Sequence, residues 1–161
     1  MIVVEGADAA GKSTLINVLK ASLVGWKVQA SEGPPKYDGE MEKRVQYYLL
    51  QSRRTIYDRH PCVSQPIYGK MRSHLDPIPE PLIKHFYSLN PLFIYCDGQG
   101  MKNHTVNPET DSKRHLEAVN NNYNALLMDY REWAVRHAVI MYRIGDPMLR
   151  VVKMVEALVN K

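Results

Sequence analysis

Cysteine is scarce in this chain, and neither cysteine nor histidine is spaced as a metal site requires. The 161 residues include only two cysteines, Cys62 and Cys96, too few for a disulfide framework. The six histidines form no H-E-x-x-H pattern or other ligand spacing. We therefore expect reduced thiols, an intracellular protein and no zinc site.

Long hydrophobic runs and runs of one charge sign are also missing. The apolar run at residues 2–4 is too short for a signal peptide or a membrane span, so we expect a cytoplasmic protein with no membrane partner. The 21 Lys and Arg residues are scattered among 17 Asp and Glu residues, giving a net charge of +4. This balance suits small anionic substrates and is weak evidence for binding of nucleic acid.

The most informative feature that is present is a phosphate-binding loop. Residues 6–13 read G-A-D-A-A-G-K-S and match G-x-x-x-x-G-K-[ST] at every defined position, directly after an apolar run. The backbone N–H groups of this loop and the N-terminus of the next helix attract anions. Lys12 can reach the β and γ phosphates of a bound nucleotide. The Ser13 hydroxyl can coordinate Mg²⁺. The residues expected to contact the nucleotide are Gly6, Ala9, Ala10, Gly11, Lys12, Ser13 and Thr14.

Strand-like and helix-like segments alternate along the rest of the chain. Strands are predicted at residues 1–5, 27–30, 54–57, 92–96 and 139–142, and helices at 12–23, 40–50, 65–74, 81–89, 112–136 and after Pro147. No repeat or linker interrupts them. The pattern predicts a single α/β domain over residues 1–161, with a parallel sheet covered by helices on both faces.

Three charged residues are candidates for the reaction centre. Asp58 and Arg59 follow the third predicted strand, at the edge where open parallel sheets bind ligands. We expect Asp58 to hold Mg²⁺ through water opposite Ser13 and Arg59 to bind a phosphate; a solvated surface turn is the alternative. Asp8 would repel bound phosphates, so we expect it to face the acceptor substrate or to cap the local turn.

The polar segment at residues 97–111 lacks apolar periodicity and predicts a mobile lid, which extends to about residue 114. It begins with D-G-Q-G, which imitates the D-x-x-G switch of GTPases, but the chain has no guanine-reading N-K-x-D element. We therefore interpret these glycines as a hinge. Lys113 and Arg114, with Lys102 nearby, are the cations expected to close on the transferring phosphoryl group as catalytic residues beside Lys12.

Residues 4–14 resemble the opening signature of the thymidylate kinase family, which carries an acidic residue at the position of Asp8. Asp58-Arg59-His60 resembles the Asp-Arg-aromatic motif of the same family. The resemblance implies a P-loop NTPase fold with a five-stranded sheet of order 2-3-1-4-5. It also implies that Asp8 contacts the acceptor sugar and that Arg59 contacts the acceptor phosphate.

Two further positions follow from this resemblance. Ser64 matches one serine of the next family motif, and Tyr68 lies one place after its tyrosine, so both are expected in the substrate site. Ala9 stands where one branch of the family has an arginine, which leaves that charge to the lid. The segment between Pro35 and Arg53 is much shorter than the family's pair of base-contacting helices, so the acceptor side is expected to be open.

These observations favour an ATP- and Mg²⁺-dependent kinase that transfers the γ-phosphoryl group to a deoxynucleoside monophosphate, either thymidylate-like or with a modified pyrimidine. The expected partners are ATP and a nucleotide acceptor, and a homodimer is left open. One alternative places the acceptor hydroxyl on DNA, such as a hydroxylated base. Another is a nucleotide-binding switch without kinase activity.

Overall fold

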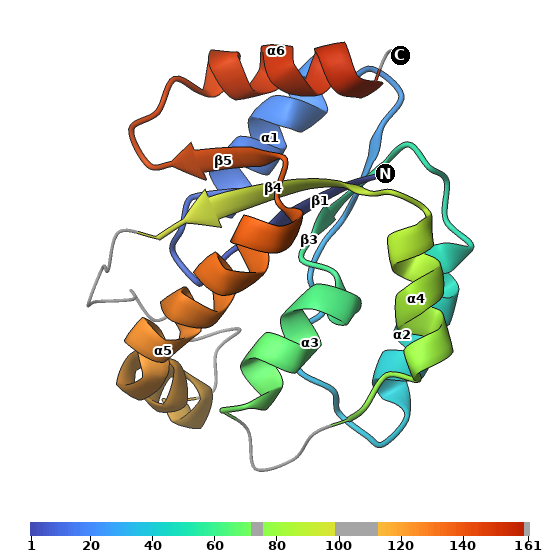
Figure 1. Ribbon diagram of the computed structural model, residues 1–161, viewed down its shortest axis with the longest axis vertical. Coiled ribbons are helices and arrows are strands. Elements are labelled where there is room, and N and C mark those ends of the chain that lie inside the picture. The colour runs from blue at the N-terminus through green and yellow to red at the C-terminus, as the bar shows by residue number, and fades with distance from the viewer. Residues whose placement is uncertain (72–75, 99–112, 160–161) are drawn as a thin grey trace.

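The computed structural model describes residues 1–71, 76–98 and 113–159, with the backbone alone at 113–120. Strands and helices alternate from β1 to α6 (Figure 1). The strands are β1 (Ile2–Glu5), β2 (Lys27–Gln29), β3 (Thr55–Asp58), β4 (Leu92–Asp97) and β5 (Ile140–Arg143). The helices are α1 (Lys12–Ser22), α2 (Glu40–Leu49), α3 (Pro61–Gly69), α4 (Glu80–Ser88), α5 (Lys113–His137) and α6 (Met148–Val159).

The five strands form one sheet of order β2-β3-β1-β4-β5, and all paired strands are parallel. This confirms the α/β class and the strand order implied by the family resemblance. β1 lies in the middle, where Val4 is in register with Asp58 of β3 on one side and Ile94 of β4 on the other. The carboxyl ends of these strands therefore meet at one edge of the sheet.

Helices cover both faces of the sheet, with α1 and α6 on one face and α2, α3, α4 and α5 on the other (Figure 1). Side chains alternate between the two faces along a strand, so the sheet supplies two cores. Ile2 and Val4 belong to the α1–α6 core, whereas Val3 belongs to the core under α2–α5. In the described part of the chain, no helix has the length and apolar character needed to cross a bilayer.

Two predicted boundaries were wrong in a way that affects the site. The helix expected at residues 65–74 begins at Pro61, because proline suits the first helical turn and the His60 ring accepts a hydrogen bond from the Cys62 N–H (3.2 Å). Asp97, expected to open the lid, is the buried last residue of β4. The rest of that segment, residues 99–112, lies outside the described residues.

Gly6 brings the loop after β1 into contact with β4. Its φ is +142°, and a Cβ built there would lie 2.3 Å from the Cys96 carbonyl oxygen. We expect Gly6→Ala to lower the free energy of unfolding by about 2–4 kcal/mol, since it adds a backbone clash to an unfavourable dihedral. Urea denaturation would measure this.

Gly33→Ala is the matched control, because Gly33 also has a positive φ (+74°) but no described atom lies within 4 Å of its built Cβ. Dihedral strain alone predicts a loss of about 1 kcal/mol there. Equal losses at the two positions would contradict the role given to the contact with Cys96.

Candidate functional site

The loop between β1 and α1 has the backbone geometry of an anion cradle. Gly11 precedes α1 in a left-handed conformation (φ 80°) and, without a side chain, leaves the first N–H groups of the helix free of a side-chain cap. Ala9 also has a positive φ (56°), which is uncommon for a residue with a Cβ. Free N–H groups at a helix N-terminus favour negative charge, so the loop is shaped for a phosphate.

Lys12 is held inside this loop. Its side chain is buried, and its ammonium donates a hydrogen bond to the Ala7 carbonyl oxygen at 2.5 Å. Burial, helped by the nearby Arg59 charge, lowers the pKa of Lys12 to about 8. An arriving phosphate would offer this ammonium a stronger partner than a neutral carbonyl, so Lys12 is poised to exchange one for the other.

Asp58 and Ser13 lie on neighbouring elements at the same sheet edge. Asp58 ends β3, and its buried Oδ1 has no hydrogen-bond partner among the described residues. Ser13, in the first turn of α1, is exposed. A buried carboxylate oxygen without a partner fits a water-coordinated Mg²⁺. No three His, Cys, Asp or Glu side chains converge within residues 1–71, 76–98 and 113–159, so the other ligands would be phosphates and water.

Arg59 joins the phosphate-binding loop to β3. It has a positive φ (64°), and its N–H donates to the Val4 carbonyl (3.0 Å) while its Nε donates to the Gly6 carbonyl (3.3 Å). A left-handed arginine is strained, and such strain is concentrated at functional sites. Here the strained backbone directs a guanidinium onto the loop.

The charge of Arg59 is shared with Asp8 and Tyr68. Its Nη2 donates to Asp8 Oδ1 (2.6 Å) and to the Tyr68 hydroxyl (2.8 Å), and that hydroxyl donates to Asp8 Oδ2 (3.0 Å). Burial would raise the pKa of Asp8, but the Arg59 and Lys12 charges outweigh it and hold that pKa well below its usual range. Asp8 is therefore a carboxylate, tied across the site instead of capping its own turn.

A small cavity adjoins this triad of Asp8, Arg59 and Tyr68. Its volume is about 70 Å³, and its lining also includes residues of α3, of α2 and of the β2–α2 connection, among them Ser64 and Gln65. Ser64 donates its hydroxyl hydrogen to the His60 carbonyl (3.2 Å). The four residues predicted for the substrate site thus line one cavity. Its volume is smaller than a nucleotide, so part of a bound nucleotide would extend beyond it unless the wall moves outward.

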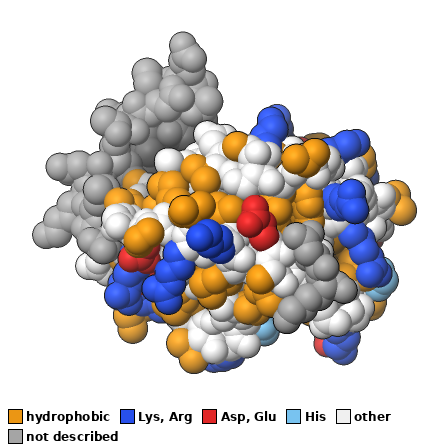
Figure 2. All heavy atoms as spheres, turned by 90° about the horizontal axis from the view of Figure 1, so that it is seen from above, with side chains coloured by type: hydrophobic (Ala, Val, Ile, Leu, Met, Phe, Trp, Pro, Cys, Tyr) orange, Lys and Arg blue, Asp and Glu red, His pale blue; other side chains and the backbone are white. Residues whose placement is uncertain are grey.

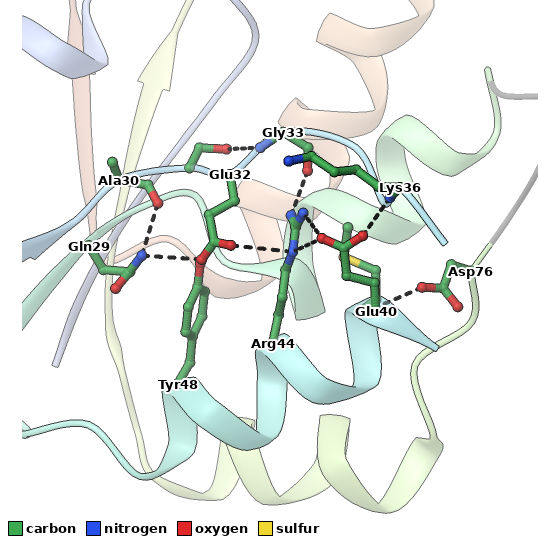
Figure 3. A network of polar contacts seen from close by, with 11 residues as sticks. Gln29, Ala30, Glu32, Gly33, Lys36, Glu40, Arg44, Tyr48 and Asp76 are labelled. Atoms are coloured by element: carbon green, nitrogen blue, oxygen red, sulfur yellow. Dashed lines mark hydrogen bonds and ion pairs between the residues drawn. The ribbon is translucent and has the colours of Figure 1, made fainter. Parts of the chain in front are cut away.

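The outer wall is a network of polar contacts (Figure 3). Arg44 is buried on α2, where it pairs with Glu40 and donates to the Gly33 carbonyl (2.7 Å). The Tyr48 hydroxyl donates to Glu32 (2.9 Å), and the Asp76 carboxylate accepts the N–H groups of Gly39 and Met41 (both 2.8 Å). Sequence analysis missed this wall, because its partners lie up to 37 residues apart.

Glu5 was also missed. It is fully buried at the end of β1, where Oε1 accepts the His60 N–H (2.7 Å) and Oε2 accepts the Tyr130 hydroxyl of α5 (3.2 Å). Burial raises the pKa of Glu5 to about 7, against the opposing effects of its hydrogen bonds and of the nearby Arg59 and Lys12 charges. One carboxyl group thus connects β1, the residue after Arg59, and α5.

Asp97 gathers two arginines at the end of β4. Its carboxylate accepts hydrogen bonds from Arg131 Nε (3.0 Å), Arg143 Nε (3.3 Å) and the Tyr95 hydroxyl (3.0 Å). The predicted lid cations are not tested in the same way. Lys113 and Arg114 begin α5, but their side chains lie outside the described residues, as does the whole of Lys102.

His60 is structural. Its ring stacks on Phe86 with centroids 3.9 Å apart and is fully buried, and burial lowers its pKa to about 3. A neutral, packed histidine neither carries charge nor reaches the cavity. In the sequence Asp58-Arg59-His60, the His60 ring therefore serves to pack the core beside Arg59.

No family model matches the chain, and no curated protein matches it by sequence. Solved structures do match over nearly its whole length. The YorR protein of Bacillus subtilis, in complex with phosphorylated GDP, superposes with a TM-score of 0.71 at 18% identity over 99% of this chain and 95% of that one. The chain has a P-loop kinase-like fold.

A second match is deoxyadenosine kinase from M. mycoides with the products dCMP and dCDP bound. The TM-score is 0.51 at 16% identity, and the match covers 99% of this chain and 97% of that one. At these identities the two matches establish the fold. The site must therefore be argued from its own residues.

The raised pKa of Glu5 predicts how the stability of the protein depends on pH. Because its pKa in the folded protein (about 7) lies above its ordinary value of 4.5, the stability linked to Glu5 is fully present below about pH 4.5 and is lost as pH rises through 7. The loss amounts to about 3 kcal/mol. We expect Glu5→Gln to become more stable relative to the wild type between pH 5 and 8, measured by urea unfolding. Parallel pH profiles for the two proteins would rule this out.

Proposed function

We propose that this protein is a nucleotide phosphotransferase that uses ATP and Mg²⁺ to phosphorylate a deoxynucleoside monophosphate. The observation that carries the proposal is the shared cavity of Asp8, Arg59, Ser64 and Tyr68, directly beside the phosphate-binding loop. The cavity presents an anion-binding fork and a carboxylate acceptor for a hydroxyl. Those are the two groups that a nucleoside monophosphate needs, placed next to the donor phosphates.

The donor side would be held by the loop. Backbone N–H groups of residues 9–13 and the Lys12 ammonium would bind the β and γ phosphates, and Ser13 and Asp58 would hold Mg²⁺, one directly and one through water. Mg²⁺ supplies charge neutralisation of the transferring phosphoryl group. Phosphoryl transfer needs little more than positioning and charge stabilisation, so these residues account for the donor half of the reaction.

The acceptor side would require an exchange of partners. In the free protein Arg59 is paired with Asp8 at 2.6 Å. An acceptor phosphate would take one edge of the Arg59 fork, while a sugar hydroxyl would take Asp8, so that the acceptor separates the pair and stands between them. Because the cavity is smaller than a nucleotide, the acceptor would either extend beyond it or push the Arg44–Glu40–Glu32 wall outward.

The resemblance to the thymidylate kinase family agrees with this assignment, and the bound ligands of the two structural matches are nucleotides in both cases. The acceptor base stays open between thymine and a modified pyrimidine. A hydroxyl on DNA and a switch without kinase activity are the competing functions, and both are separable by the assay below.

The test is coupled ADP release with ATP and Mg²⁺ across the ribo- and deoxynucleosides, their monophosphates and a short DNA with free hydroxyls. We expect turnover with a deoxynucleoside monophosphate. Arg59→Lys keeps the charge but loses the fork, so kcat/KM should fall about 10- to 100-fold. Arg150→Lys, at an exposed position of α6, is the control and should leave turnover unchanged. Absence of turnover with every monophosphate would overturn the proposal.

Lys12 gives an independent prediction. Because its pKa is lowered to about 8, the free protein loses this positive charge as pH rises through 8. ATP affinity should therefore fall between pH 7.5 and 9.5, approaching tenfold per pH unit above pH 8, as measured by calorimetric titration. Arginine stays charged in this range, so Lys12→Arg should show a flat profile. The same decline in both proteins would show that another group is responsible.

A further inference from the structure

A second concave surface lies at the opposite edge of the sheet. Its volume is about 940 Å³, and its walls come from the α1–β2 turn, the residues before β3, the α4–β4 and α5–β5 connections and the end of α6. In Figure 1 this is the side where both chain ends are marked, away from the arrowheads of β4 and β5. We call this surface the amino-edge groove. Nothing in the proposed phosphotransfer uses it.

The groove is positively charged. Arg53, Arg54 and Arg136 line it, and Glu156 is the one acidic residue among its described lining. Arg136 pairs with Glu132 one turn away on α5, but neither Arg53 nor Arg54 forms an ion pair with a described acidic side chain. Figure 2, seen from the side of α6, shows Lys and Arg side chains spread over this face, with some of them at the right-hand edge of the view. Arg53 and Arg54 are both exposed, so their guanidinium groups are accessible to a ligand in the groove.

The same groove carries aromatic surface. Trp26 and Tyr87 are half-buried in its walls, and the His137 ring lies 5.1 Å from the Tyr87 ring. Tyr87 is fixed by the Trp133 indole N–H, which donates to its hydroxyl (3.2 Å). Aromatic faces held in place by neighbours offer a stacking surface at little entropic cost.

Guanidinium forks recognise phosphate oxygens, and fixed aromatic faces recognise a planar base. The volume lies within the range of small-ligand sites. We propose that the amino-edge groove is a second nucleotide site, which binds phosphates through Arg53 and Arg54 and a base against Trp26 and Tyr87. The strands of four to six residues between the two edges separate it from Lys12 by about 15–20 Å, so the same nucleotide cannot occupy both sites.

The experiment counts bound ATP, by equilibrium dialysis of the whole chain with radiolabelled ATP. The wild type should bind two equivalents, and Lys12→Ala should retain the one in the groove. Adding Arg53→Gln and Arg54→Gln to Lys12→Ala should weaken the remaining site at least tenfold. Arg150→Gln with Lys153→Gln is the matched control, since it removes the same charge from exposed positions of α6 outside the groove.

Two further measurements separate the possible outcomes. Inorganic tripolyphosphate should bind the Lys12→Ala protein more weakly than ATP does, because it lacks a base. Photolabelling of that protein with 8-azido-ATP should mark peptides containing Trp26 or Tyr87, whether or not the arginine variants fold well. Three outcomes would overturn the proposal. The Lys12→Ala protein could lose all ATP binding, or the α6 control could weaken binding as much as the Arg53 and Arg54 substitutions do. The third outcome is binding of single-stranded DNA that depends on Arg53 and Arg54, without binding of ATP. The inference stands or falls separately from the proposed phosphotransfer.

Discussion

The parallel pairing of β1 with β3 on one side and β4 on the other is the constraint on which the site depends. Hydrogen bonding of the central strand to both neighbours fixes three carboxyl ends side by side. The phosphate-binding loop then emerges between Asp58 and Asp97, and the Arg59 backbone is bonded to Val4. A shift of either neighbour by two residues would move a carboxylate by about 7 Å and dismantle the site without altering a single functional residue.

The pKa values of Glu5, at the end of β1, and of Asp8, in the loop that follows, are shifted in opposite directions. Glu5 and Asp8 are three residues apart, yet the pKa of the former is raised and that of the latter is lowered. Glu5 is fully buried, and its burial outweighs its hydrogen bonds and the nearby Arg59 and Lys12 charges, whereas Asp8 is paired directly with the Arg59 guanidinium at 2.6 Å. The environment, and not the residue type, decides which of them is charged at neutral pH.

The sequence alone predicted the features whose residues lie close together along the chain. The phosphate-binding loop is one contiguous motif, and Asp58-Arg59 directly follows an apolar strand, so both could be placed before any contact was known. The contacts from Arg44 to Gly33 and from Asp76 to the start of α2, the arginines on Asp97 and the link from Glu5 to Tyr130 could not, because their partners come together only through tertiary packing. Asp97 was misplaced because a polar, glycine-containing segment follows it, and that composition hid the fact that β4 ends on a buried carboxylate.

For the proposed reaction, the Asp8–Arg59 pair also affects how readily water could replace the acceptor. Water is the most abundant competitor for a phosphoryl group, but it carries no negative charge with which to displace Asp8 from the guanidinium. While that pair remains closed, the cavity beside the loop holds about 70 Å³ and the Arg59 guanidinium is engaged by Asp8. For a phosphotransferase built this way, the resting ion pair would limit futile hydrolysis, since water offers the guanidinium no charge to replace that of Asp8.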